Sequence, residues 1–142
     1  MSKKRAGKPA AREAATRAVP GSPCPCGTGR PYGDCCGPLH RGRAAATAEQ
    51  LMRSRFSAFA VGDEPYLLRT WHPDTRPPRL DLDPAQRWTG LEVLRTTEGG
   101  PFHAEGTVEF RAHCSERGQA DVLHEHSRFV RVGGSWVYLD AI

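Results

Sequence analysis

The sequence contains no long apolar run. A membrane-spanning helix needs about 18 or more consecutive apolar residues, and no stretch of this chain approaches that length. The N-terminus, MSKKRAGKPAAREAATRAVPG, begins with basic residues as a signal peptide does, but the apolar segment that should follow is missing. We therefore expect no membrane span and no export. We predict a cytoplasmic protein whose residues 1–21 form a disordered basic tail.

The chain also lacks the pattern of a protein that reads nucleic-acid bases. Its three Trp and three Tyr are not interleaved with clusters of Lys or Arg, so sequence-specific nucleic-acid binding is not expected. Basic residues are instead concentrated near the N-terminus. Residues 1–43 carry nine Lys or Arg and two acidic residues, a formal charge of +7, whereas the whole chain carries +4. This asymmetry predicts contact with an anionic partner, and a merely solubilising tail is the alternative.

Cysteine is scarce outside one short segment. Four of the five cysteines stand within CPCGTGRPYGDCC, residues 24–36. Thiols stay reduced in the cytoplasm, and the adjacent Cys35 and Cys36 would strain a disulfide. Metal binding is therefore the preferred interpretation, and redox-active thiols are the alternative.

The spacing of these cysteines, C-x-C-x8-C-C, supplies four thiolates to a single ion. Zinc in structural sites takes four protein ligands in a tetrahedron and keeps no open position. We predict one structural zinc ion bound by Cys24, Cys26, Cys35 and Cys36. His40 is an alternative ligand in place of Cys36, because two adjacent cysteines form an awkward chelate.

A helix is predicted from about Ala48 to Val61. Thr47 and Gln50 form a capping box at its start, and Gly62 ends it. On a helical wheel Arg53 and Ser57 point away from the apolar face, but Arg55 projects into its middle. The apolar face consists of Leu51, Met52, Phe56 and Phe59.

A second helix is predicted directly after the first. Asp63 caps it and Pro65 stands in its first turn, where a missing N–H costs nothing. The helix should end at His72, because the residue before Pro73 disfavours helical backbone. Residues 73–87, which contain four prolines, are predicted to be a loop.

From Trp88 onward the hydrophobic period changes from helical to two. In residues 102–114 one face is apolar or small, from Phe102 through Val108 to Cys114, and the other face is polar. SERGQ turns the chain, and the two glycines of VRVGGSW form a two-residue hairpin. Helices followed by an antiparallel sheet predict an α+β layer fold, in which Cys114 is a small buried residue.

These motifs resemble a known family. CPCGTGRPYGDCCG is similar to the SEC-C motif, the zinc-binding element also found at the end of the SecA translocation ATPase. LMRSRFSAFAVGDEPYLLRTWHP and HEHSRFVRVGGSWVYLD resemble the YchJ family. The resemblance covers residues 22–142 and implies a zinc knuckle followed by a nuclear transport factor 2-like domain, in which helices cover a curved antiparallel sheet and leave a cone-shaped cavity. Some members carry a second knuckle at the C-terminus, and we expect none in this chain.

The expected organisation has three parts. Residues 1–21 are the basic tail, residues 22–43 are the zinc knuckle and its linker, and residues 44–142 are the nuclear transport factor 2-like domain. We expect the knuckle to be a separate unit whose loss leaves the sheet domain folded.

The sequence is compatible with two functions. The SEC-C motif of the translocation ATPase is associated with binding a partner chaperone and the ribosome, so the resemblance implies a non-catalytic adaptor that docks on a protein or ribosome through its basic knuckle. The alternative is a small-molecule-binding protein, or a lyase or isomerase, that uses the cavity. The cavity candidates are Arg55, Tyr66, His72, Glu125, Tyr138 and Asp140.

A structural interpretation of the cavity residues is favoured over a catalytic one. A buried Arg55 needs a counter-charge, and we predict an ion pair with Glu125, or with Asp140 as the second choice. His72 would then only cap a helix end.

Overall fold

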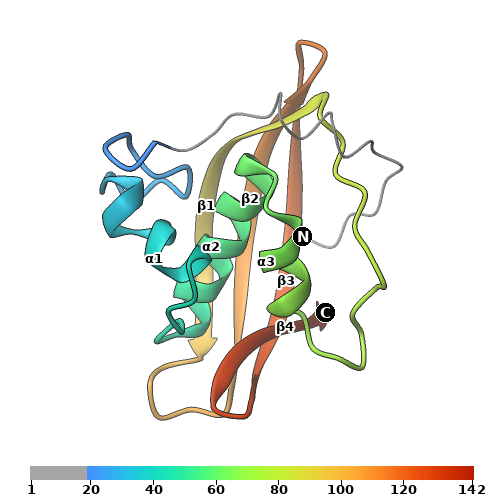
Figure 1. Cartoon of the computed structure of the whole chain (residues 1–142). Helices are drawn as coiled ribbons and strands as arrows, with labels where there is room; N and C mark the ends of the chain where they lie inside the picture. The colour runs from blue at the N-terminus through green and yellow to red at the C-terminus, as the bar shows by residue number, and fades with distance from the viewer. Residues whose placement is uncertain (1–18) are drawn as a thin grey trace.

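The structure is a computed structural model that describes residues 19–142 (Figure 1). The predicted tail falls almost entirely on residues 1–18, which lie outside the described residues. Within the described part, no helix is long and apolar enough to cross a membrane. The elements are η2 Tyr32–Asp34, α1 Cys36–His40, α2 Ala48–Val61, α3 Glu64–Arg69, β1 Gln86–Glu98, β2 Glu105–Glu116, β3 Gln119–Val132 and β4 Ser135–Ala141.

The strands of residues 86–141 form one antiparallel meander in the order β1-β2-β3-β4. Arg117 and Gly118, with φ of 52° and 83°, make the turn between β2 and β3. Gly133 and Gly134, with φ of 59° and 85°, make the turn between β3 and β4. Positive φ at both central residues matches the right-handed twist of the flanking strands. The predicted α+β class and the two-residue hairpin are confirmed.

Helix α2 has the predicted bounds. Thr47 Oγ1 accepts a hydrogen bond from the Gln50 amide at 3.0 Å, and Gly62 ends the helix with φ of 78°. In a capping box the Gln50 side chain would accept a hydrogen bond from the Thr47 amide. Gln50 Oε1 instead accepts from the amide of the preceding residue, Ala46, at 2.6 Å.

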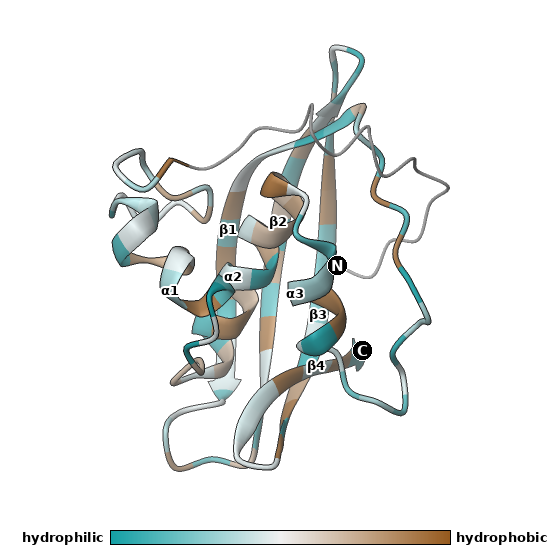
Figure 2. Cartoon of the chain, in the orientation of Figure 1, coloured by the Kyte–Doolittle hydropathy of each residue, from teal (hydrophilic) through white to brown (hydrophobic). Residues whose placement is uncertain are grey.

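The core lies between α2 and the inner face of the sheet. Apolar and polar residues alternate along the strands (Figure 2), and Val108, Phe110 and Ala112 of β2 are fully buried. Cys114 is buried as predicted. Phe102, however, is fully exposed, at 100%. The prediction for Phe102 is wrong because β2 begins only at Glu105, which leaves Phe102 in the preceding loop.

Helix α3 is shorter than predicted. It ends at Arg69, and residues 70–72 run parallel to β4 instead. The His72 amide donates to Tyr138 O at 2.7 Å, and the Tyr138 amide donates to Thr70 O at 2.8 Å. These bonds to the edge of the sheet replace the bonds of a further helical turn. The position of β4 is a tertiary feature, so the sequence around Pro73 could not reveal it.

Candidate functional site

Four cysteine sulfurs meet in one cluster near the N-terminus of the described chain. The Sγ atoms of Cys24, Cys26, Cys35 and Cys36 all lie within 4.8 Å of one another. Cys26 Sγ and Cys35 Sγ are 3.5 Å apart, none of the four forms a disulfide, and all but Cys35 are buried. Zn–S bonds of about 2.3 Å in a tetrahedron place sulfurs about 3.8 Å apart. The four cysteines can therefore bind one metal ion.

The local backbone brings the two cysteine pairs together. Pro23 and Pro31 form an antiparallel bridge, and the Cys24 amide donates to Arg30 O at 2.9 Å. Gly27 and Gly29, with φ of 86° and 85°, allow the chain to reverse between these points. The turn returns the chain to η2 and α1, where the second pair of cysteines stands.

The buried thiols of the cluster shift one another's pKa values through hydrogen bonds. Hydrogen bonds from the Cys26 and Cys36 thiols lower the pKa of Cys24 far below its usual range. Hydrogen bonds with Cys24 and Cys26 raise the pKa of Cys36, and the bond with Cys24 raises the pKa of Cys26 to about 11. Soft thiolate ligands in this number suit zinc.

Both ring nitrogens of His40 form hydrogen bonds within the protein. Its Nδ1 accepts from the Tyr32 hydroxyl at 2.6 Å, and its Nε2 lies 2.8 Å from Ser54 O, which can only accept. Burial lowers the pKa of His40, which agrees with a neutral ring that carries its proton on Nε2. Because both ring nitrogens of His40 form hydrogen bonds, neither is free to bind a metal ion in place of Cys36.

Residues 22–40, here called the cysteine unit, pack directly against α2. Cys24 Sγ lies 3.5 Å from Ser57 Oγ, and Arg53 Nη1 donates to Cys26 O at 2.9 Å. Arg69 of α3 donates to His40 O at 2.8 Å. Ser57 points away from the apolar face, as predicted, but it is fully buried because the cysteine unit covers it. The face of α2 that lacks large apolar residues is covered by the cysteine unit, which is therefore not a separate body.

Comparison with known proteins agrees with this two-part arrangement. Residues 22–38 match the model of the SEC-C motif, and residues 47–141 match that of the YchJ middle nuclear transport factor 2-like domain. The chain belongs to the YchJ family. The boundary between the two matches falls where the cysteine unit leads into α2.

Relatives of this YchJ-family chain are similar over most of their length. The UPF0225 protein of Streptomyces coelicolor is 63% identical over 123 residues, which are 86% of this chain and 96% of the relative. A SEC-C motif-containing protein from Rhodopseudomonas palustris, solved in solution, is 36% identical with a TM-score of 0.72, over 85% of this chain and 98% of that chain. Another SEC-C motif-containing protein, from Psychrobacter arcticus, has a crystal structure and is 30% identical to this chain. Its TM-score is 0.66, over 87% of this chain and 82% of that chain.

The interior of the domain contains Arg55, as the helical wheel predicts, but without the predicted partner. Its Nη1 donates to Leu67 O at 2.8 Å and to Thr70 Oγ1 at 2.7 Å. Glu125 instead accepts from Ser127 Oγ at 2.6 Å and from the Tyr138 hydroxyl at 3.4 Å. The predicted Arg55–Glu125 ion pair is therefore not formed. Because α3 ends early, the Leu67 carbonyl in its last turn and the Thr70 hydroxyl supply the acceptors. The prediction had assigned this role to a carboxylate.

The guanidinium of Arg55 packs against two aromatic rings. Its Cζ lies 5.1 Å from the centre of the Trp71 ring and 4.9 Å from that of Tyr138. Burial lowers the pKa of Arg55 to about 10, so the side chain stays positively charged at neutral pH. Nothing in the sequence signals this contact of Trp71 with Arg55.

The other cavity candidates are dispersed. The Tyr66 hydroxyl lies 2.6 Å from Ser54 Oγ. His72 Nδ1 accepts from the Asp74 amide at 3.0 Å near the surface. Asp140 forms two hydrogen bonds with Arg128, at 2.8 and 2.7 Å, so it is not the partner of Arg55. Of the six candidates, the structure brings together Arg55, Tyr138 and, through the Tyr138 hydroxyl, Glu125.

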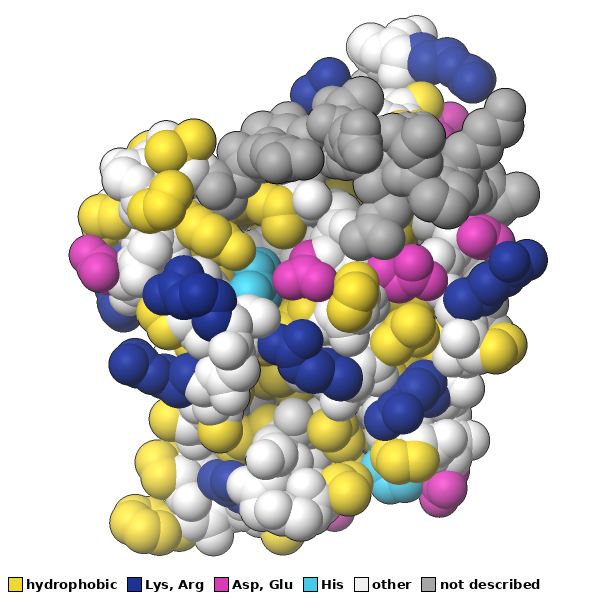
Figure 3. All heavy atoms as spheres, viewed as in Figure 1, with side chains coloured by type: hydrophobic (Ala, Val, Ile, Leu, Met, Phe, Trp, Pro, Cys, Tyr) yellow, Lys and Arg dark blue, Asp and Glu magenta, His cyan; other side chains and the backbone are white. Residues whose placement is uncertain are grey.

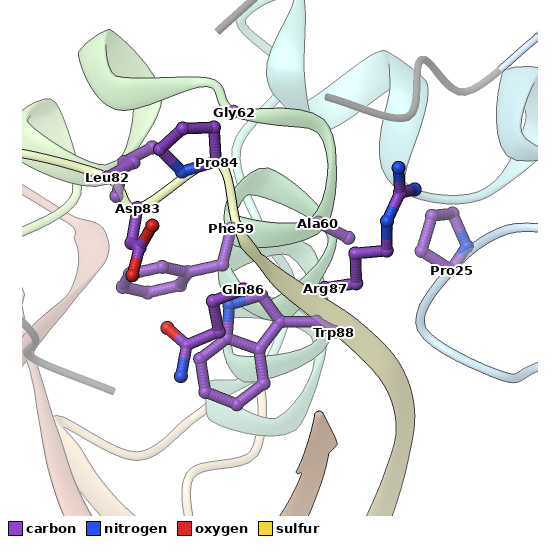
Figure 4. Close-up of a pocket in the computed structure, with 10 residues that line it drawn as sticks. All are labelled: Pro25, Phe59, Ala60, Gly62, Leu82, Asp83, Pro84, Gln86, Arg87 and Trp88. Carbon is purple, nitrogen blue, oxygen red and sulfur yellow. The ribbon is translucent and has the colours of Figure 1, made fainter. Parts of the chain in front are cut away.

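A groove of about 250 Å³ lies where the cysteine unit meets the far end of α2. Figure 4 shows the rings of Phe59 and Trp88 on its floor and the Arg87 side chain extending toward Pro25. The loop before β1 supplies Leu82 and Pro84 to the wall. Sequence reasoning did not find this groove, because three segments far apart in the chain form it.

Proposed function

We propose that this protein is a cytoplasmic zinc-binding adaptor that uses its cysteine unit to dock on an anionic partner. The observation that carries the metal proposal is the cluster of four free thiols within 4.8 Å of one another. Cys24, Cys26, Cys35 and Cys36 would bind one zinc ion through four thiolates. A bound zinc would cross-link the turn to α1, and a site filled by four protein ligands has a structural role.

The docking proposal is supported by the charge around the cysteine unit. Arg30, Arg41 and Arg43 are exposed, and Arg69 is exposed beside them on α3. Asp34 is the exposed acidic residue of this region. Arg side chains gather on the face over α1, α2 and α3 (Figure 3). Cations on a rigid support attract an anionic surface at long range, and ribosomal RNA is such a surface.

We expect the Arg41→Gln/Arg43→Gln variant to bind ribosomes more weakly than the native chain. Removal of two phosphate contacts should lower affinity several-fold at low salt and reduce the salt dependence of binding, because fewer counterions are released. Co-sedimentation with purified ribosomes at several salt concentrations measures both quantities.

The matched control is Arg111→Gln/Arg117→Gln, which removes the same charge from exposed positions on β2 and the following turn. The control should bind like the native chain. Equal binding by all three proteins at every salt concentration would contradict the docking proposal. Equal weakening of binding in both variants would contradict docking through the cysteine unit, because it would show that only the net charge of the chain matters.

A further inference from the structure

Two buried donor groups in the interior have no hydrogen-bond partner. They are Arg55 Nη2 and Trp71 Nε1, and among the described residues no other buried side-chain nitrogen or oxygen shares this state. Arg55 is 2% exposed and Trp71 is 3% exposed. Nearly all buried polar groups in folded proteins are paired, so two neighbouring exceptions need an explanation.

The two side chains come from different layers and converge. Arg55 stands in the middle of α2, whereas Trp71 belongs to the segment that bridges to β4. The guanidinium lies 5.1 Å from the Trp71 ring centre, and the Trp71 and Tyr138 rings meet edge to face at 5.2 Å. The site is on the side of α2 that faces α3 and β4, whereas α1 lies on the other side (Figure 1). It is therefore distinct from the cysteine unit.

Arg55 also has no ion-pair partner among the described residues. Its hydrogen bonds go to a carbonyl and a hydroxyl, and no carboxylate of residues 19–142 forms an ion pair with it. A buried arginine usually has an anionic partner. An anion from outside the chain would neutralise the charge and could accept from both unpaired donors.

We propose that this interior site binds the carboxylate group of a small organic molecule, with Arg55 and Trp71 as its donors. Two N–H groups from adjacent side chains suit the two oxygens of a carboxylate. One positive charge matches a monoanion, whereas the nearby carboxylate of Glu125 disfavours a dianion such as phosphate. The rings of Trp71, Tyr138 and Phe129 pack in series and make the surroundings of the two donors apolar.

The test is calorimetric titration of the full chain with sodium formate, acetate, propionate and benzoate at constant ionic strength. Acetamide and benzamide serve as neutral isosteres, and inorganic phosphate as the alternative anion. We expect at least one carboxylate to bind with one-to-one stoichiometry and its amide not to bind. Affinity should fall at least about tenfold, which is about 1.4 kcal/mol, in Arg55→Met and in Trp71→Phe, since the latter keeps an aromatic ring and removes only the N–H donor.

Arg128→Met is the matched control, because it removes an exposed arginine paired with Asp140, and it should bind like the native chain. The proposal is overturned if no carboxylate of the panel binds, which would leave water as the occupant. It is also overturned if phosphate binds more tightly than every carboxylate, or if both interior variants keep native affinity.

Discussion

Cys24→Ser is expected to abolish zinc binding and to loosen helix α2 together with the cysteine unit. Loss of one thiolate opens the four-ligand site, and structural zinc contributes about 10–16 kcal/mol of binding free energy in small zinc domains. Cys24 also contacts Ser57 of α2, and Arg53 donates to the carbonyl of Cys26. The free energy of unfolding of the whole chain should therefore fall by at least about 3 kcal/mol in saturating zinc.

Zinc content by mass spectrometry and amide hydrogen exchange measure the two effects of Cys24→Ser. Exchange should accelerate along α2, and less in β2, which lies deeper in the sheet. Cys114→Ser is the matched control, because Cys114 is a buried cysteine outside the cluster, and it should keep its zinc. Unchanged exchange in α2 of the zinc-free variant would show that the cysteine unit is energetically separate after all.

Arg55→Ala and Arg55→Met should differ strongly in their effect on stability. Truncation to Ala removes a large buried side chain between Trp71 and Tyr138, and the cavity should cost about 3–5 kcal/mol. Met retains most of the volume and removes a buried charge that has no ion-pair partner. Replacement of buried charges by apolar groups of similar size is often neutral or stabilising, so Arg55→Met should change stability by less than about 1 kcal/mol.

Chemical denaturation of the two Arg55 variants beside the native chain gives these values directly. A loss in Arg55→Met as large as that in Arg55→Ala would contradict the account. That result would mean that the hydrogen bonds to Leu67 and Thr70 make the charge itself essential to the fold, and that Arg55 is a structural residue.

Local sequence signals predicted α2 and the hairpin turns well. The bounds of α2 depend on Thr47, Gln50 and Gly62, which act within one turn of the helix. The Gly133–Gly134 turn depends on the positive φ that glycine permits. Such features require no knowledge of the rest of the fold.

Tertiary contacts determine what the sequence did not predict. Helix α3 ends early because residues 70–72 pair with β4, which is more than 60 residues away in the chain. The same pairing positions Thr70 and Trp71 around Arg55. The helical wheel placed Ser57 away from the apolar face, but it could not show the cysteine unit that buries this residue.

The cysteine cluster was predictable in composition but not in its surroundings. The spacing of the four cysteines is sufficient to predict their convergence, because the intervening segment is short and rich in glycine. The occupied nitrogens of His40 were not predictable. One of their partners, Ser54, is 14 residues away on α2, and its position depends on how the cysteine unit packs.

X-ray absorption at the zinc edge tests the central claim most directly. Protein purified with zinc should contain one ion per chain, and its absorption fine structure should fit four sulfur ligands at about 2.3 Å with no nitrogen. Three sulfurs and one imidazole nitrogen would contradict the assignment of Cys36 and point to His40. The absence of stoichiometric zinc from protein that has been supplied with it would contradict the metal site altogether.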